Sequence, residues 1–390
     1  MNAPATNGAT NGIVKGWCPD AWRPMMAGDG LLVRVRPPLG RLTRAQILGL
    51  CKAAVAHGNG EIDATTRANL QIRGVREDSW RPLIDELLKL ALIDPDPVRE
   101  ARANILVAPD WHEGDDTHRI AEALRARVSE LPDLPGKVGF AIDAGVTPTV
   151  QAAPADFRVE RAASGVLILR ADGRDLGTPL SPGTEVDRLI ALAHWFVDSG
   201  GAVSGGRMAR HHAALPDWAN GTTPSKTSAR QPKPGEHPLG IAIGLPFGRV
   251  TATALRRLVE AEPAIRAIRP TPWHIIVCET DAPLATQPDP AHFITDPISP
   301  ILRADACVGA LACPQGSVET RALARRLTSH ITGRLHVSGC AKGCARAAPA
   351  DVTLTGREGR YDLAFDARAG APPTRTQLDV AQILVHFGAD

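Results

Sequence analysis

An internal duplication constrains the fold of this chain more than any other feature of its sequence. Residues 31–43 (LLVRVRPPLGRLT) and 240–251 (GIAIGLPFGRVT) share strand-like alternation, a proline and glycine turn and a final threonine. A run of helical periodicity follows each threonine, and threonine is a preferred N-cap residue. A second strand pattern then follows, at residues 69–75 and 274–279. This repeated strand–helix–strand order predicts two ferredoxin-like half-domains.

The duplication continues beyond these half-domains. Residues 136–143 (GKVGFAID) match residues 333–340 (GRLHVSGC), and a basic helical segment precedes each of them. Each half of the chain then ends in a helical pattern. We therefore predict an α+β chain with an internally duplicated fold, in which paired ferredoxin-like half-domains and two mixed α/β modules surround a central crevice.

The same patterns indicate where the parts of the chain begin and end. Residues 201–237 are rich in glycine, proline and serine, a composition that disfavours regular core elements, so we expect a passive linker, a lid, or both. The residues of chemical interest in this segment are Arg207, Arg210, His211 and His212. The other expected parts are a disordered tail at 1–21, half-domains at 22–95 and 238–298, and α/β modules at 96–200 and 299–390.

Four of the seven cysteines gather near the C-terminus, as Cys307-x5-Cys313 and Cys340-x3-Cys344. Thiolates are the ligands of a [4Fe–4S] cluster, so these motifs favour such a cluster if the intervening segment folds back. Structural zinc is an alternative, although the gap within its cysteine pairs is usually about two to four residues. Disulfides would need an oxidising compartment, which nothing in the sequence indicates. Buried, inert thiols are expected at the other cysteines, Cys18, Cys51 and Cys278.

The composition argues against several classes of function. With 390 residues, 44% hydrophobic residues and a net charge of +2, the chain is globular and has no overall charge that would recruit nucleic acid. Its start has neither the basic nor the apolar region of a secretion signal, and no apolar run is long enough for a membrane span. We therefore expect a cytoplasmic protein with no nucleic-acid or membrane partner.

Together, the duplication and the cysteine motifs resemble the nitrite and sulfite reductase superfamily, from about Trp22 to the C-terminus. The resemblance implies a nitrite/sulfite-reductase-like fold. It also implies that a [4Fe–4S] cluster is held by the cysteines of the two motifs, Cys307, Cys313, Cys340 and Cys344. Residues 63–75 (DATTRANLQIRGV) are similar to a family segment whose first arginine, here Arg67, faces the tetrapyrrole and its anion.

Two further matches to that family depart from its pattern. Residues 134–139 (LPGKVG) look like a family segment with two anion-binding lysines, but Gly139 replaces the second lysine and only Lys137 remains. Arg102 resembles another anion-contacting arginine, one residue out of register. A six-electron reduction of a small oxyanion needs concentrated positive charge and a proton supply, so the missing lysine argues against a reductase. The overall pattern is most similar to the precorrin-3B synthases of this superfamily.

That similarity implies an oxygen-dependent monooxygenase of aerobic cobalamin biosynthesis, which hydroxylates precorrin-3A at C-20 and closes a γ-lactone. It further implies a [4Fe–4S] cluster, a mononuclear non-haem iron, and electrons from NADH or from a reduced electron-transfer partner. Dioxygen and the polycarboxylate tetrapyrrole are then the substrates. The alternatives are a sirohaem-dependent sulfite or nitrite reductase and a non-catalytic carrier of a cluster or a tetrapyrrole.

A polycarboxylate substrate needs guanidinium and ammonium partners. The substrate-binding residues that we predict are Arg67, Arg73, Arg102, Lys137 and Lys342, and the arginines beside the same strands are Arg34, Arg36 and Arg76. No catalytic residue and no ligand set for the non-haem iron can be predicted. Residues 110–113 (DWHE) and the adjacent His211 and His212 are only local groupings of suitable donors.

Overall fold

The computed structural model describes residues 18–203, 206–229 and 231–389, so most of the predicted tail at 1–21 lies outside the described residues. The chain forms two compact units. The larger one contains Gly30–Pro297, and the smaller one begins at Ile298.

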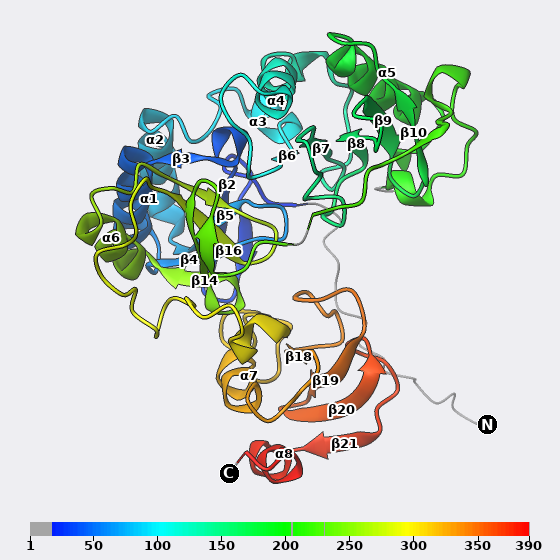
Figure 1. The fold of residues 1–390 in the computed structure, drawn as a ribbon. Helices are drawn as coiled ribbons and strands as arrows, with labels where there is room; N and C mark the ends of the chain where they lie inside the picture. Colours follow the sequence, from blue (N-terminus) through cyan, green and yellow to red (C-terminus); the bar gives the residue numbers. More distant parts are fainter. Residues whose placement is uncertain (1–17, 204–205, 230, 390) are drawn as a thin grey trace, which may run out of the picture. The chain divides into compact units, whose positions relative to one another are not determined.

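The larger unit contains two five-stranded sheets that correspond to the two predicted half-domains (Figure 1). The strands of the first sheet are, in order, β1 (Met25–Ala27), β2 (Gly30–Val35), β5 (Leu70–Val75), β4 (Glu61–Ala64) and β14 (Arg249–Thr251). Those of the second sheet are β12 (Gly235–His237), β13 (Gly240–Gly244), β16 (Ile275–Glu279), β15 (Ala267–Pro270) and β3 (Leu42–Thr43). Because β14 pairs with β4 and β3 pairs with β15, each half-domain lends one short strand to the edge of the other sheet.

The two borrowed strands lead into matching helices. Thr43 caps helix α1 (Arg44–His57) by accepting a hydrogen bond from the Gln46 backbone, and Thr251 caps helix α6 (Ala252–Ala261) by accepting one from the Ala254 backbone. These caps satisfy N–H groups that the first turn of a helix leaves without a partner. The expected threonine caps are therefore present in both copies. Helices α1, α6 and α2 (Trp80–Lys89) contribute leucine and isoleucine side chains to one core beneath both sheets.

The first α/β module, also in the larger unit, is a six-stranded sheet. Its strands are, in order, β11 (Thr223–Pro224), β10 (Leu176–Pro179), β9 (Leu167–Ala171), β8 (Phe157–Arg161), β7 (Phe140–Asp143) and β6 (Ile105–Val107). The sheet is parallel from β6 to β8 and antiparallel from β8 to β11. The helices of this module are α3 (Pro97–Arg102), α4 (Asp116–Ala126) and α5 (Glu185–Asp198). Apolar side chains of β7 and β8, among them Phe140 and Phe157, pack against α4 and α5.

The smaller unit repeats this order of pairing. Its sheet consists of β17 (Ala304–Ala306), β18 (Leu335–Ser338), β19 (Ala350–Arg357), β20 (Arg360–Ala367) and β21 (Arg375–Leu378). It is parallel from β17 to β19 and antiparallel from β19 to β21. Helix α7 (Arg321–Leu327) connects β17 to β18, as α4 connects β6 to β7, and α8 (Val380–Phe387) follows β21, as α5 follows β10. The two modules are therefore structural copies, as the sequence predicts.

The longest described stretch of the predicted linker or lid, residues 206–229, lies along the first module, whereas its last residues, Gly235–His237, form β12 of the second sheet and so belong to the second half-domain. Residues 206–229 form two short turns, η5 (Met208–Arg210) and η6 (Asp217–Ala219), and then the edge strand β11. Met208 is fully buried in the core of that module, and the Ala229 backbone donates to the Pro148 carbonyl. The low content of regular elements that the composition indicates is therefore compatible with close packing.

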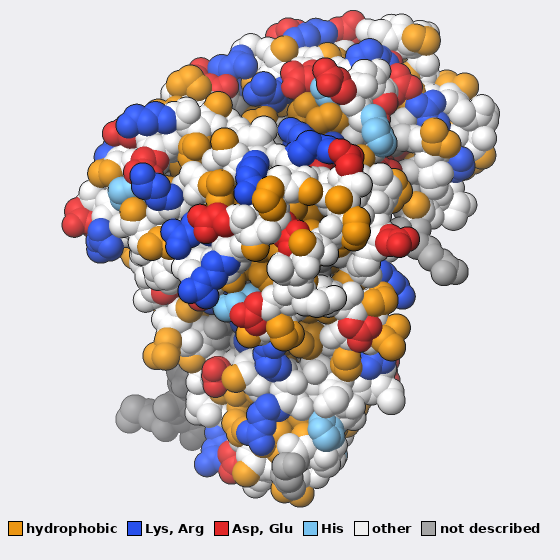
Figure 2. Space-filling view, turned by 60° about the vertical axis from the view of Figure 1, so that its left-hand side comes forward, with side chains coloured by type: hydrophobic (Ala, Val, Ile, Leu, Met, Phe, Trp, Pro, Cys, Tyr) orange, Lys and Arg blue, Asp and Glu red, His pale blue; other side chains and the backbone are white. Residues whose placement is uncertain are grey.

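The surface shows no concentration of one charge on the face drawn in Figure 2, where basic and acidic side chains are interspersed. This distribution fits the net charge of +2. In the part of the chain that the structure describes, no helix combines the length and the apolar character that a membrane crossing needs.

Candidate functional site

The two cysteine pairs follow neighbouring parallel strands. Cys307 comes directly after β17, and Cys340 comes two residues after the end of β18. Ala306 and Val337 are paired in the sheet, so the carboxyl ends of these strands lie at the same edge. The parallel pairing therefore brings the two motifs together, although helix α7 separates them in the sequence.

Glycines allow the two cysteine loops to lie in close contact. A Cβ on Gly339 would lie 3.1 Å from the Gly309 Cα and 3.2 Å from the Gly316 Cα. The Gly339 backbone N–H donates to the Cys307 sulfur at 3.2 Å. Larger residues at these positions would push the loops apart, so the spacing between the cysteine pairs depends on backbone-to-backbone contact.

All four thiols share one neighbourhood. Burial raises the pKa of Cys344 above its ordinary value, the Lys342 charge opposes this, and the charges of the other three thiols, Cys307, Cys340 and Cys313, raise it further. Among the described residues, these cysteines included, no group of three or more His, Cys, Asp and Glu side chains is placed closely enough to hold a metal ion. The donor chemistry, four sulfurs from two loops, nevertheless fits an iron–sulfur cluster better than a site for a hard cation.

An ion pair joins the chain before the first cysteine to the chain after the last one. The Asp305 carboxylate accepts from Arg334 at 3.0 Å and from Arg346 at 3.4 Å. Asp305 lies on β17 just before Cys307, and Arg346 follows Cys344 closely. The contact therefore limits how far the two cysteine loops can move apart.

A second group of interest lies in the larger unit, around Arg67 in the turn between β4 and β5. The Arg67 Nη2 donates to the Lys137 carbonyl at 2.7 Å. Burial lowers the pKa of Arg67 to about 10, and the charge of Arg207 lowers it further. Among the described residues, Arg67 forms no ion pair with a carboxylate, and Asp156, which acts on it at longer range, compensates only part of its charge.

Arg34 on β2 belongs to the same group. Burial lowers its pKa, a contact with Cys18 raises it, and the nearby charge of Arg36 lowers it. The Gln71 side-chain oxygen, in the orientation that satisfies both groups, accepts from Arg34 at 2.8 Å. Cys18 therefore differs from the expected buried, inert thiol, because it is partly exposed and contacts a guanidinium group. Cys51 and Cys278 are buried, and burial raises the pKa of each to about 12.

Two other predicted substrate residues already have acidic partners. Arg73 is buried and donates to Asp63 at 3.3 Å. Arg102 pairs with Asp133 at 2.7 Å and also donates to the Ser129 carbonyl at 3.0 Å. Of the predicted set, the structure brings Arg67 and Lys137 together in the larger unit, and it places Lys342 beside Cys344 in the smaller one.

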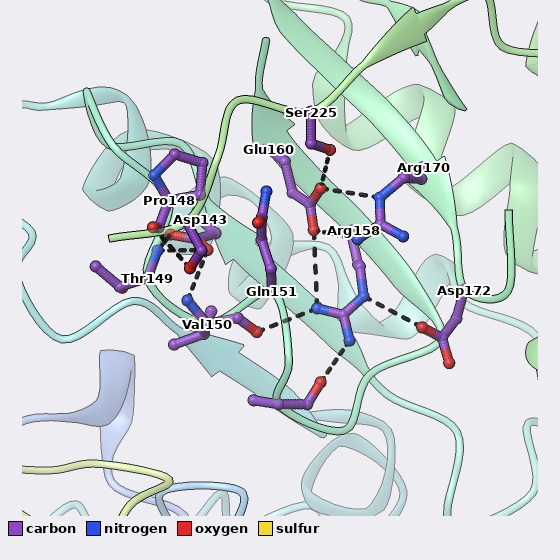
Figure 3. Close-up of polar contacts among 12 residues, drawn as sticks. Asp143, Pro148, Thr149, Val150, Gln151, Arg158, Glu160, Arg170, Asp172 and Ser225 are labelled. Atoms are coloured by element: carbon purple, nitrogen blue, oxygen red, sulfur yellow. Dashed lines mark hydrogen bonds and ion pairs between the residues drawn. The ribbon is translucent and has the colours of Figure 1, made fainter. Parts of the chain in front are cut away.

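Charged side chains are buried on the face of the first module's sheet opposite α4 and α5 (Figure 3). Glu160 accepts from Arg170 at 2.7 Å and from the Ser225 hydroxyl, and Arg158 donates to the Val150 carbonyl at 3.2 Å. At the end of β7, Asp143 accepts from the Thr149 and Val150 backbones at 2.9 and 2.8 Å. These contacts hold residues 144–155 over the sheet. In the smaller unit, the corresponding position carries Cys340 and its loop.

A cavity of about 470 Å³ lies elsewhere in the larger unit, and His112 and Glu113 line it. Its arginines are mostly paired: Arg41 and Arg269 both donate to Glu279, at 2.7 and 2.6 Å. The DWHE grouping thus lies in a cavity, but it does not belong to any set of described donors that could hold an iron.

Comparisons with known proteins agree with this architecture. A family profile, the "Nitrite/Sulfite reductase ferredoxin-like half domain", matches residues 23–90. A curated "Precorrin-3B synthase" of Sinorhizobium sp is 30% identical, over 94% of this chain and 86% of its own length. A "Ferredoxin--nitrite reductase" of Synechococcus elongatus is 25% identical, over 89% of this chain and 80% of its own length. The solved structure of the Mycobacterium tuberculosis NirA protein superposes with a TM-score of 0.54 at 18% identity, covering 90% of this chain and 78% of that one. The predicted fold class is therefore confirmed.

Proposed function

Because the chain belongs to the precorrin-3B synthase family of the nitrite and sulfite reductase superfamily, we propose that it converts precorrin-3A to precorrin-3B. In this reaction dioxygen hydroxylates the macrocycle at C-20, and an acetate side chain closes a γ-lactone. One oxygen atom enters the product and the other leaves as water, with two electrons from NADH or a reduced partner protein and two protons.

The observation that carries the proposal is the pair of guanidinium groups on Arg34 and Arg67, which form no ion pair with a carboxylate among the described residues, although Asp20 and Asp156 act on them at longer range. Both side chains are partly buried, and a partly buried charge without an ion pair is unfavourable, so the two arginines favour an anionic ligand. Guanidinium groups form bidentate, charge-assisted hydrogen bonds with carboxylates, which a precorrin carries in number. Their role is to bind and orient the macrocycle through its side chains.

The cysteine loops supply the second part of the proposal. A [4Fe–4S] cluster bound by Cys307, Cys313, Cys340 and Cys344 would supply electrons one at a time. Burial raises the pKa of Cys344 overall, and the Lys342 charge opposes this shift, so Lys342 partly offsets the cost of forming the thiolate that a cluster ligand needs. For the mononuclear iron that the family implies, the described residues offer no ligand set, and we assign it no step.

The test combines cofactor analysis with turnover on anaerobically purified full-length protein. We expect iron and acid-labile sulfide without sirohaem, and conversion of precorrin-3A that requires both dioxygen and a reductant. Cys313→Ser should lose iron and sulfide, whereas Cys51→Ala, which changes a buried thiol of α1, should retain both. Stoichiometric sirohaem with nitrite or sulfite reduction would overturn the proposal. That result would favour the alternative to which the similarity with ferredoxin–nitrite reductases points.

A further inference from the structure

A buried carboxylate joins residues 206–229 to the strand that follows Lys137. Asp156 is fully buried, and it accepts from the Gly139 backbone at 3.1 Å and from the Met208 backbone at 2.9 Å. Its third donor is the Arg207 Nε, at 2.7 Å. Three donors from two distant segments therefore hold Asp156, and Asp156 in turn holds the Met208 backbone and the Arg207 side chain in place.

The fixed position brings Arg207 close to Arg67. The charge of Arg207 is the largest influence after burial that lowers the pKa of Arg67, and the charge of Arg34 acts in the same direction. Asp156 is the acid that opposes them, and it already pairs with Arg207. The group formed by Arg34, Arg67 and Arg207, which we call the guanidinium cluster, therefore carries more positive than negative charge.

The remaining donors of Arg207 are available to a ligand. Asp156 contacts only the Nε, and the two terminal nitrogens have no partner among the described residues. A quarter of the side chain is exposed. A guanidinium group held by its Nε presents its outer edge in a fixed orientation, which suits one carboxylate oxygen or a bidentate carboxylate.

We propose that Arg207 is a substrate-binding residue, which together with Arg67 binds a carboxylate of the tetrapyrrole. Residues 206–229 then complete the binding site rather than only connecting the two half-domains. The inference rests on the proposed function, because it takes the polycarboxylate macrocycle as the ligand. It goes beyond that function by assigning the role to a residue of the predicted linker, positioned by Asp156.

A different role for Arg207 would be purely structural, as a tether that holds this segment against Asp156. The two roles differ in measurable ways. A tether affects stability but has no reason to change the salt dependence of ligand binding. A ligand contact changes the affinity and its salt dependence, because screening acts on the attraction between the guanidinium group and the anion.

Uroporphyrin, a fluorescent tetrapyrrole with eight carboxylates, is a suitable probe for the full-length protein. We expect Arg207→Gln to weaken binding roughly ten- to a hundredfold, the range for loss of a hydrogen bond between charged groups. Its affinity should also fall less steeply with added salt. Arg207→Lys should recover part of the affinity, because it retains the charge. Arg210→Gln is the matched control, since Arg210 is exposed in the same short turn and should bind as the unsubstituted chain does.

The possible outcomes distinguish a failure of the proposed tetrapyrrole function from a failure of the role assigned to Arg207. If the unsubstituted chain fails to bind uroporphyrin, the proposed tetrapyrrole function fails. If it binds but Arg207→Gln has the same affinity and salt dependence, the assignment of Arg207 is wrong and the function stands. If Arg207→Gln lowers only the melting temperature, Arg207 is a tether and the inference is overturned. A weakened affinity with a reduced salt dependence supports it.

Discussion

The Arg249 Nε lies 2.7 Å from the Asp63 Oδ1, although the two residues belong to different half-domains. Arg249 begins the borrowed strand β14, and Asp63 is its pairing partner on β4. The other Asp63 oxygen accepts from Arg73 at 3.3 Å. One buried carboxylate therefore compensates two guanidinium groups and joins the copies of the duplication. In the second sheet, Glu279 plays the same part for Arg41, which lies just before β3, and for Arg269.

Removal of this carboxylate should destabilise the larger unit. We expect Asp63→Ala to lower the free energy of unfolding by about 3–5 kcal/mol, because the buried ion pairs of Asp63 with Arg73 and Arg249 would be lost. Urea denaturation measures the change. Glu260→Ala removes an exposed acid of α6 and should change the stability by less than about 0.5 kcal/mol. Equal effects of the two substitutions would show that Asp63 does not hold the half-domains together.

The fold follows from local sequence patterns to a large extent. The threonine caps, the periodicity of α1 and the repeated strand patterns are properties of short segments, so the duplication predicts the order of elements correctly. The exchange of β3 and β14 was not predicted. Edge pairing depends on which sheet lies next to each strand, and short strands have little pattern of their own.

The candidate site, like the fold, can be predicted from local sequence only in part. The cysteine spacing is local and indicates a cluster without any knowledge of the fold. The roles of individual arginines depend on tertiary partners: Asp63 pairs with Arg73 and Asp133 pairs with Arg102, whereas Arg67 has no ion pair within the described part of the chain. Arg207 lies in a segment that looks like a linker, and only the contact with Asp156 gives it a fixed position. The sequence has no local signal for this contact, because Asp156 and Arg207 are 51 residues apart.

Asp305 should matter for cluster retention, since its ion pairs join the two cysteine loops. We expect Asp305→Ala to reduce the iron and sulfide bound per chain at least severalfold after gel filtration. The reason is that Arg346, which follows the second cysteine loop, would lose its ion pair with Asp305. Asp379→Ala removes an acid of the same unit that is half exposed and should leave the iron content unchanged. Full retention of iron in Asp305→Ala would show that the glycine contacts alone hold the loops.

Stability should fall as the pH rises through the range in which Asp143 titrates. Burial raises the pKa of Asp143 to about 7, from about 3.9 in an unfolded chain. Between these values the folded state binds a proton that the unfolded state has released, so increasing pH favours unfolding, by about 1.4 kcal/mol per unit of pKa difference. Below about pH 4 the carboxyl is protonated in both states, and the full stabilisation is present.

The comparison with Asp143→Asn isolates this effect. The variant should lose the part of the pH dependence between about pH 4 and 7 that belongs to Asp143, while other groups continue to titrate. Urea unfolding of both proteins across this range gives the difference directly. Identical pH profiles would mean that Asp143 has an ordinary pKa and that its backbone hydrogen bonds from Thr149 and Val150 outweigh its burial.

Gly139 should accommodate a side chain poorly, because its strand lies against Asn104. A Cβ there would lie 2.6 Å from the Asn104 Nδ2 and 2.9 Å from the Asn104 carbonyl oxygen. We expect Gly139→Ala to lower the free energy of unfolding by about 1–3 kcal/mol, because the strand would have to move away from Asn104. Gly145→Ala is the control, since the nearest atom to its new Cβ would lie at an ordinary 3.8 Å.

Gly139→Ala should also weaken uroporphyrin binding, because the Gly139 backbone donates to Asp156, which holds Arg207 in place. Unchanged stability and binding in Gly139→Ala would show that the position of this strand does not affect the guanidinium cluster.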